Sequence, residues 1–156
     1  MSIVCLNGTL MDAGAARIDP SDRGFTLGDG LFETIAVTAG TPRRLPAHLA
    51  RLRDGASVLD LPLPWSDAQL AQWIEAAVSA NSLADAAVRL TVSRGPGPRG
   101  VLPPAAPAPT LVIAAAPRPD MDGPVTLSTC GRTRRNQHSP LARIKSLNYL
   151  DNVLAR

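Results

Sequence analysis

The sequence predicts an α+β fold in which a mixed or antiparallel sheet carries helices on one side. Most segments with regular hydrophobic spacing alternate with a period of two, which is typical of strands, and only two or three have helical spacing. Strands and helices also do not follow one another in the regular alternation that produces a parallel sheet. With 156 residues, the chain is long enough for one domain or slightly more.

The first predicted strands surround a tight turn near the N-terminus. Asn7-Gly8 separates two short apolar runs, and this pair favours a two-residue hairpin because both central positions need a positive φ. The stretch IDPSDRGFTLGDG (18–30) is rich in Gly and Asp and is expected to be a loop. LFETIAVTAGTPRRL (31–45) then predicts a strand, a turn at Ala39-Gly40 and another strand.

Two helices are predicted next. In PAHLARLRDGASVLDL (46–61), apolar residues recur at helical spacing, and Pro46 occupies a first-turn position where proline is tolerated. The second helix begins with Ser66 and Gln69, whose spacing is that of a capping box. Asn81 is its expected end.

Further strands are predicted in the second half. AAVRLTVSRG (86–95) alternates, TLVIAAAP (110–117) is continuously apolar, and PVTLSTC (124–130) has strand character as well. The stretch GPGPRGVLPPAAPAP (95–109) can be neither a helix nor a central strand, because it is dense in Pro and Gly.

The end of the chain is expected to contain an irregular basic segment and a helix. The helix covers 146–156, with Ser146 as its N-cap. We therefore expect an N-terminal small α+β domain at 1–119, and at 120–156 a connector with the beginning of a second domain. The latter has too few elements to bury its own apolar faces, so further chain or a partner is expected to complete it.

The composition excludes several classes of protein. Charged residues make up 19% and apolar residues 45%, so a disordered charged chain is excluded. No run approaches the ~18 apolar residues of a membrane span, and no signal sequence is present, so a soluble cytoplasmic protein is expected. Cys5 and Cys130 fit no metal-ligand pattern and are expected to be buried free thiols; no metal site is expected.

The net charge of +3 includes a basic cluster at Arg132, Arg134 and Arg135. Stacking aromatic residues are missing around this cluster, and no nucleic-acid-binding motif accompanies it. No nucleic-acid partner is therefore expected.

Lys145 is the only lysine of the chain and directly precedes the expected helix start at Ser146. The helix dipole and apolar surroundings would both disfavour the ammonium form and lower the pKa of Lys145. A neutral amine is the form that Schiff-base chemistry needs. Alternatively, Lys145 is merely an exposed residue at a helix entrance.

Four stretches resemble, in order, the motifs of the class IV aminotransferase family. They are DRGFTLGDGLFETIAV, AHLARL, SRGPGPRG and RNQHSPLARIKSLNYLDNVLAR. This family of fold type IV pyridoxal-phosphate enzymes includes branched-chain and D-amino-acid aminotransferases and aminodeoxychorismate lyase. The resemblance implies the small domain of that fold, pyridoxal 5'-phosphate as cofactor, a small-molecule amine as substrate and a homodimer. Family chains extend about 100 residues further.

The resemblance gives roles to individual residues. Lys145 matches the lysine that binds the cofactor covalently and then moves the substrate proton. Arg51 matches the arginine that holds the cofactor phosphate, for which a guanidinium fork is suited. Alone, Arg51 would equally fit a surface arginine covering Leu52. Thr34 is a catalytic candidate that positions substrate or a proton, or simply a β-branched strand residue. His48 is expected to pack or hydrogen-bond.

Substrate contacts are expected from Phe32, Arg99, Arg135 and Asn136. Phe32 replaces the substrate-contacting tyrosine of D-amino-acid aminotransferases, so its hydrogen bond is lost. Arg99 lies on the loop that, in the family, reaches a neighbouring subunit's active site. Val101 replaces the histidine that follows this arginine in D-amino-acid enzymes.

The missing histidine, the SRGxGxRG pattern and the stretch RNQHSPLARIK, with Arg135 and Asn136 ahead of the lysine, look more like the lyase of the family. The resemblance therefore favours a lyase that converts 4-amino-4-deoxychorismate to 4-aminobenzoate, a folate precursor, and pyruvate. An aminotransferase acting on D-amino or branched-chain amino acids is the first alternative. A non-catalytic relative or binding module is the second. The family supplies the partner of the pyridine nitrogen from chain beyond Arg156, so residues 1–156 alone are expected to turn over substrate poorly.

Overall fold

A six-stranded antiparallel sheet forms the centre of the computed structural model, which describes residues 2–119 and 123–156. Its strand order is β2-β1-β6-β5-β3-β4. The strands are β1 (Ile3–Leu6), β2 (Thr9–Asp12), β3 (Gly30–Thr38), β4 (Thr41–Pro42), β5 (Ala86–Ser93) and β6 (Thr110–Pro117). The helices are α1 (Arg23–Leu27), α2 (Leu45–Val58), α3 (Asp67–Ala80), the 3₁₀ helix η1 (Pro140–Arg143) and α4 (Leu150–Leu154). The predicted α+β class is confirmed.

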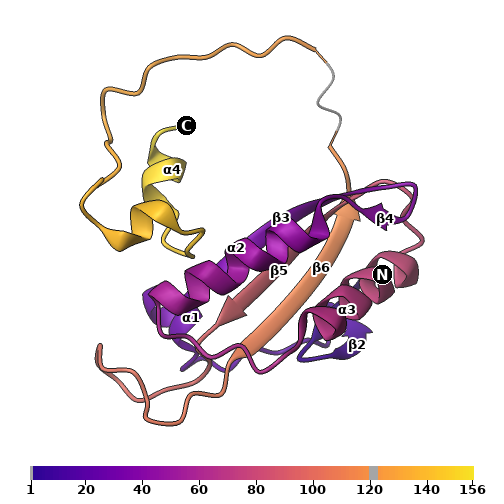
Figure 1. The fold of residues 1–156 in the computed structure, drawn as a ribbon, viewed down its shortest axis with the longest axis horizontal. Coiled ribbons are helices and arrows are strands. Elements are labelled where there is room, and N and C mark those ends of the chain that lie inside the picture. Colours follow the sequence, from indigo (N-terminus) through magenta and orange to yellow (C-terminus); the bar gives the residue numbers. More distant parts are fainter. Residues whose placement is uncertain (1, 120–122) are drawn as a thin grey trace.

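Helices α2 and α3 lie across one face of the sheet, and the core fills the space between them (Figure 1). Alternate residues of the central strands point toward these helices and are buried. The core includes Leu31, Ile35, Val37, Val88, Leu90, Val92, Leu111 and Ile113 from the strands and Leu49, Leu52, Leu70, Ile74 and Ala77 from the helices. The other face of β3, β5 and β6 is therefore available for function.

The predicted turn at Asn7-Gly8 and the predicted caps of α3 are confirmed. Asn7 (φ 49°) and Gly8 (φ 88°) connect β1 to β2 in the left-handed region. Ser66 accepts a hydrogen bond from the Gln69 N–H (3.2 Å), and the Gln69 side chain accepts one from the Ser66 N–H (2.9 Å). Asn81 ends α3.

Three local predictions are wrong. The expected loop 18–30 contains α1, whose N-terminus is capped by Asp22, which accepts a hydrogen bond from the Gly24 N–H. Residues 124–130 form no strand, because the side chains of this segment are exposed and no sheet edge pairs with it. The final helix begins at Leu150, and Ser146 instead pairs with Leu31 of β3.

The segment after residue 123 runs away from the sheet and returns over α2 (Figure 1). The expected domain boundary at 119/120 and part of the predicted connector fall outside the described residues. Cys5 is a buried free thiol as predicted, whereas Cys130 is exposed, because its segment leaves the sheet. No helix in the described part of the chain is both long and apolar enough to cross a membrane.

Candidate active site around Lys145

Lys145 lies beside the edge of β3. The Phe32 N–H donates to the Lys145 carbonyl (3.0 Å), and the Leu147 N–H donates to the Gly30 carbonyl (2.9 Å). These two bonds flank the bridge between Leu31 and Ser146. The backbone that carries Lys145 thus continues the sheet locally, so the lysine is held by strand pairing and not by a helix terminus.

The Lys145 side chain lies over aromatic rings. Its Nζ is 4.2 Å from the centroid of the Phe32 ring and 5.6 Å from that of Tyr149. The two rings meet edge to face at 5.1 Å. Lys145 is half-buried and forms no ion pair among the residues that the structure describes. The amine therefore lies beside an aromatic surface, with no carboxylate partner among the described residues. The predicted helix dipole, however, is absent, because α4 begins five residues later.

Arg89 of β5 is a second cation at this site that the sequence reasoning missed. Its guanidinium carbon lies 3.9 Å from the Phe32 ring centroid. Burial lowers the pKa of Arg89, and Tyr149 acts in the opposite direction. Arg89 pairs with Thr34 across the strands, and Phe32 and Thr34 lie on the same face of β3. The alternation of β5 could have revealed it, because Arg89 and Thr91 are polar on the uncovered face.

Arg51 is fixed by a carboxylate that sequence reasoning also left without a role. Its Nε and Nη2 donate to the two oxygens of Glu33 at 2.7 and 2.6 Å, and His48 Nδ1 lies 2.7 Å from Glu33 Oε2. The hydrogen-bonding role expected for His48 is confirmed. About half of the Arg51 side chain (52%) stays exposed, so its guanidinium is oriented yet still accessible to an anion.

Glu33 is buried on the face of β3 that α2 covers. Burial alone would raise the pKa of Glu33, but hydrogen bonds from Arg51 and His48 outweigh this effect and hold its pKa below the usual value. Glu33 in turn raises the pKa of Arg51. A carboxylate at a core-facing strand position was the sequence signal for this cluster.

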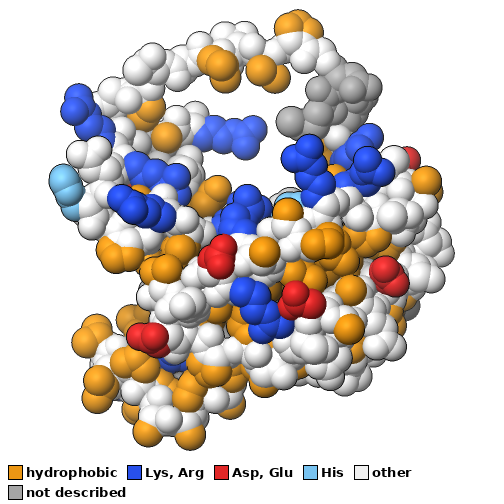
Figure 2. Space-filling view, viewed as in Figure 1, with side chains coloured by type: hydrophobic (Ala, Val, Ile, Leu, Met, Phe, Trp, Pro, Cys, Tyr) orange, Lys and Arg blue, Asp and Glu red, His pale blue; other side chains and the backbone are white. Residues whose placement is uncertain are grey.

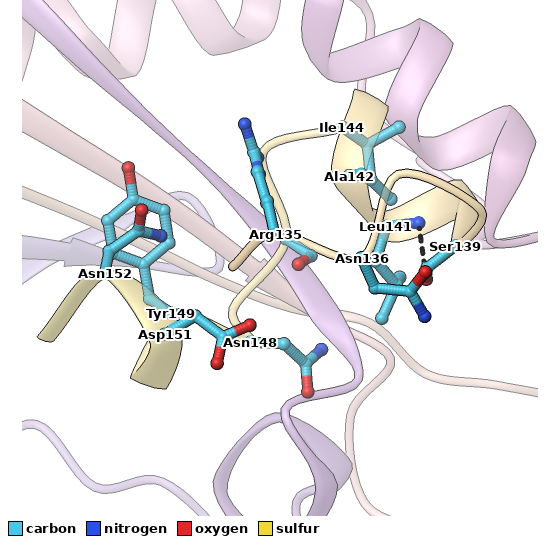
Figure 3. A pocket seen from close by; sticks show the side chains of 11 residues that line it. Arg135, Asn136, Ser139, Leu141, Ala142, Ile144, Asn148, Tyr149, Asp151 and Asn152 are labelled. Carbon is cyan, nitrogen blue, oxygen red and sulfur yellow. Dashed lines mark hydrogen bonds between the residues drawn. The ribbon is translucent and has the colours of Figure 1, made fainter. Parts of the chain in front are cut away.

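The remaining predicted residues lie in two other places. Arg135 and Asn136 line a cavity of about 150 Å³ together with Tyr149 and Asp151 (Figure 3). Because Tyr149 also packs on Phe32, this cavity adjoins the Lys145 site. Arg99 lies on the Pro-rich loop and lines an open cavity of about 590 Å³ beside α1. Figure 2 shows several basic side chains facing the space between the returning segment and the body of the molecule.

These groups fit a cofactor that carries an aldehyde and a phosphate. Lys145 supplies an amine free of ion pairs among the described residues, and Arg51 supplies an accessible guanidinium fork. Residues other than Lys145 and Arg51 would hold the ring of such a cofactor.

The α+β fold, with a lysine at its sheet edge and an oriented arginine on α2, indicates an enzyme. More specifically, the chain belongs to the class IV aminotransferase family. The family model "Amino-transferase class IV" matches residues 30–156.

Three known proteins illustrate this membership. The crystal structure of 4-amino-4-deoxychorismate lyase from Pseudomonas aeruginosa is 42% identical, with a TM-score of 0.80, over 98% of this chain and 55% of its own. The structure of branched-chain amino acid aminotransferase from Escherichia coli is 26% identical, with a TM-score of 0.83. The match covers 98% of this chain and 54% of that one. D-alanine aminotransferase from Bacillus licheniformis is 32% identical over 98% of this chain and 54% of the relative's length. The chain thus spans about half the length of these relatives.

Proposed function

We propose that the protein acts as a pyridoxal-phosphate-dependent lyase that converts 4-amino-4-deoxychorismate to 4-aminobenzoate and pyruvate. The observation that carries the enzymatic part is the placement of the single lysine, held at the edge of β3 with its amine against Phe32. The lyase is favoured over a transaminase by the 42% identity to the Pseudomonas aeruginosa enzyme. The alternative, an aminotransferase, is supported by the D-alanine and branched-chain relatives.

The residues would divide the work as follows. Lys145 would hold the cofactor covalently, and its free amine would remove a proton from the carbon next to the substrate amine. Arg51, oriented by Glu33, binds the phosphate. When bound, pyridoxal phosphate supplies a ring that stabilises the negative charge left by proton removal. Phe32 and Thr34 shape the substrate side of the sheet, where Arg89 offers a further anion contact.

A homodimer is part of this proposal. The Pro-rich loop leaves the sheet beyond β5, and Arg99 on it is exposed. A second copy would bring its Arg99 to the substrate carboxylate, while Arg135 and Asn136 contact the substrate from the cavity beside Tyr149.

The cofactor is tested by reductive trapping on the purified protein. We expect added pyridoxal phosphate to produce a visible absorption band, and borohydride to fix one cofactor on Lys145, as mapped by mass spectrometry. Since Lys145 is the only lysine, the Lys145→Ala variant leaves no side-chain amine and should lose the adduct. Modification at the N-terminal amine alone, or none at all, would refute the proposed cofactor role.

The reaction is tested by product analysis. The whole protein, loaded with cofactor, should release pyruvate and 4-aminobenzoate from 4-amino-4-deoxychorismate, and Lys145→Ala should lower the rate by at least about a thousandfold, since the covalent step is lost. D-alanine or a branched-chain amino acid with 2-oxoglutarate serves as the competing assay. Amino-group exchange without pyruvate release from aminodeoxychorismate would establish the transaminase instead.

A further inference from the structure

We infer that Arg23 is a positioning residue that holds the Pro-rich loop, residues 95–109, and thereby sets where Arg99 lies. This inference rests on the proposed function, in which Arg99 contacts substrate. Arg23 belongs to the DRG stretch that precedes β3, and neither the cofactor contacts nor the substrate contacts described above include it.

Arg23 binds the loop directly. Its side chain is only 4% exposed. Nη1 donates to the carbonyls of Gly100 (3.1 Å) and Leu102 (3.3 Å), and Nη2 donates to that of Val101 (2.9 Å). These three carbonyls directly follow Arg99. A loop rich in proline has few N–H groups for hydrogen bonds of its own, so a guanidinium that binds three consecutive carbonyls can fix its path.

Arg23 is itself anchored to the body of the protein. Its Nε donates to Asp29 Oδ2 (2.8 Å), which also accepts from Arg94 Nε (2.8 Å). Arg94 also donates hydrogen bonds to two carbonyls at the end of α2, those of Leu59 (2.7 Å) and Asp60 (2.9 Å). Burial alone would raise the pKa of Asp29, but the hydrogen bonds from Arg94 and Arg23 hold its pKa below the usual value. A charged carboxylate therefore joins the two arginines.

The neighbouring residue Asp22 fixes both ends of the same loop. Its Oδ2 accepts hydrogen bonds from Ser93 Oγ and Thr110 Oγ1, both at 2.8 Å, and these residues are the last of β5 and the first of β6. Asp22 thus closes the base of the loop, and Arg23 holds its far part.

The loop has little apolar contact that could hold it otherwise. Val101 and Leu102 are 84% and 81% exposed. Because these side chains do not enter the core, the fold of the sheet does not depend on the loop's path. The polar contacts of Arg23 therefore hold the part of the loop that directly follows Arg99.

The first test is limited proteolysis of the holoenzyme. Trypsin cleavage after Arg99, measured by mass spectrometry, should become about ten times faster in Arg23→Met, because the loop opens more often. Arg53→Met is the matched control. Arg53 also joins a carboxylate, Asp67 (2.8 Å), to backbone carbonyls, those of Leu63 and Trp65, but away from the loop. It should leave cleavage after Arg99 unchanged.

The second test is a double-mutant cycle on steady-state kinetics. Arg23→Met should raise the KM for the substrate about tenfold with a smaller change in kcat, because the Lys145 site is intact. In Arg99→Ala, the further change Arg23→Met should have no effect, since Arg23 acts through Arg99. Arg23→Lys should rescue little, because one ammonium cannot reproduce the planar fork.

The inference is overturned if cleavage after Arg99 stays as slow as in the wild type, or if the effects of Arg23→Met and Arg99→Ala on KM add. Failure of the proposed function has a different signature. The wild-type protein would then turn over no candidate substrate, while the proteolysis would still report whether Arg23 holds the loop.

Discussion

Glu33 is a buried carboxylate whose neighbours favour its ionised form. It is buried on β3 and binds two groups of α2, Arg51 and His48. Replacing it by Gln leaves these partners without their counter-charge. We expect Glu33→Gln to lower the free energy of unfolding at pH 7 by about 2 kcal/mol, less than for a fully buried pair because Arg51 is half-exposed. Urea denaturation measures this value.

The same substitution should change the pH dependence of stability. Because the pKa of folded Glu33 is lowered, its ionised form stabilises the fold above its ordinary pKa of about 4.3, and this contribution is lost as the pH falls toward the lowered value. The gap between wild type and Glu33→Gln should therefore shrink between pH 7 and pH 3. Asp67→Asn is the control, since the Arg53–Asp67 pair is exposed and worth less than about 1 kcal/mol. A gap that stays constant with pH would contradict the ionised state of Glu33.

Single residues of the site were predictable to different extents. Lys145 and Arg51 stand in motifs that span few residues, so the sequence was enough to propose them. The roles of Glu33 and Arg89 depend on residues that are distant in the sequence. Glu33 binds Arg51, 18 residues later, and Arg89 interacts with Tyr149, 60 residues later. These contacts form only when β3 packs against α2 and when the segment that carries Tyr149 folds back onto the sheet. Local sequence patterns do not reveal either event.

At the scale of elements, the structure agrees with the sequence where local chemistry decides the conformation. The hairpin at Asn7-Gly8 needs positive φ angles, and the start of α3 needs the Ser66 cap; both requirements are readable from neighbouring residues. The central strands were equally readable, because α2 and α3 cover only one face of the sheet.

The wrong elements have a common physical reason, which is that local pattern does not reveal tertiary partners. The five residues of α1 are too few for helical periodicity to appear, and Asp22 stabilises this helix while also binding Ser93 and Thr110. Residues 124–130 alternate like a strand but find no sheet edge to supply their hydrogen bonds. Ser146 resembles an N-cap, yet its backbone is used in the pairing with Leu31.

At the scale of the whole molecule, the contact between β3 and the lysine segment connects the first strands to the end of the chain. Besides the backbone bonds at Gly30 and Phe32, Asn148 Nδ2 donates to the Gly28 carbonyl (3.0 Å). Ile144 enters the core beside Gly55 of α2. The position of Lys145 thus depends on residues more than 100 positions earlier.

Gly30 is where this dependence can be tested. A Cβ on Gly30 would meet the Val92 carbonyl and lie 2.8 Å from Leu147 Cδ1, so both the pairing with β5 and the lysine segment must shift. We expect Gly30→Ala to lower the free energy of unfolding by about 1–3 kcal/mol, as overpacking does. Because Leu147 is displaced as well and lies two residues after Lys145, we also expect borohydride trapping of pyridoxal phosphate on Lys145 to decrease severalfold.

The control is Gly131→Ala, where nothing lies within 4 Å of the added Cβ. It should change neither stability nor trapping. If Gly30→Ala destabilises the protein but traps cofactor as efficiently as the wild type, the edge of β3 does not position the amine. If trapping falls at temperatures well below the unfolding transition, the loss reflects the displaced segment and not a smaller folded population. The second outcome is expected, because the Phe32 N–H donates to the Lys145 carbonyl and the Leu147 N–H donates to the Gly30 carbonyl.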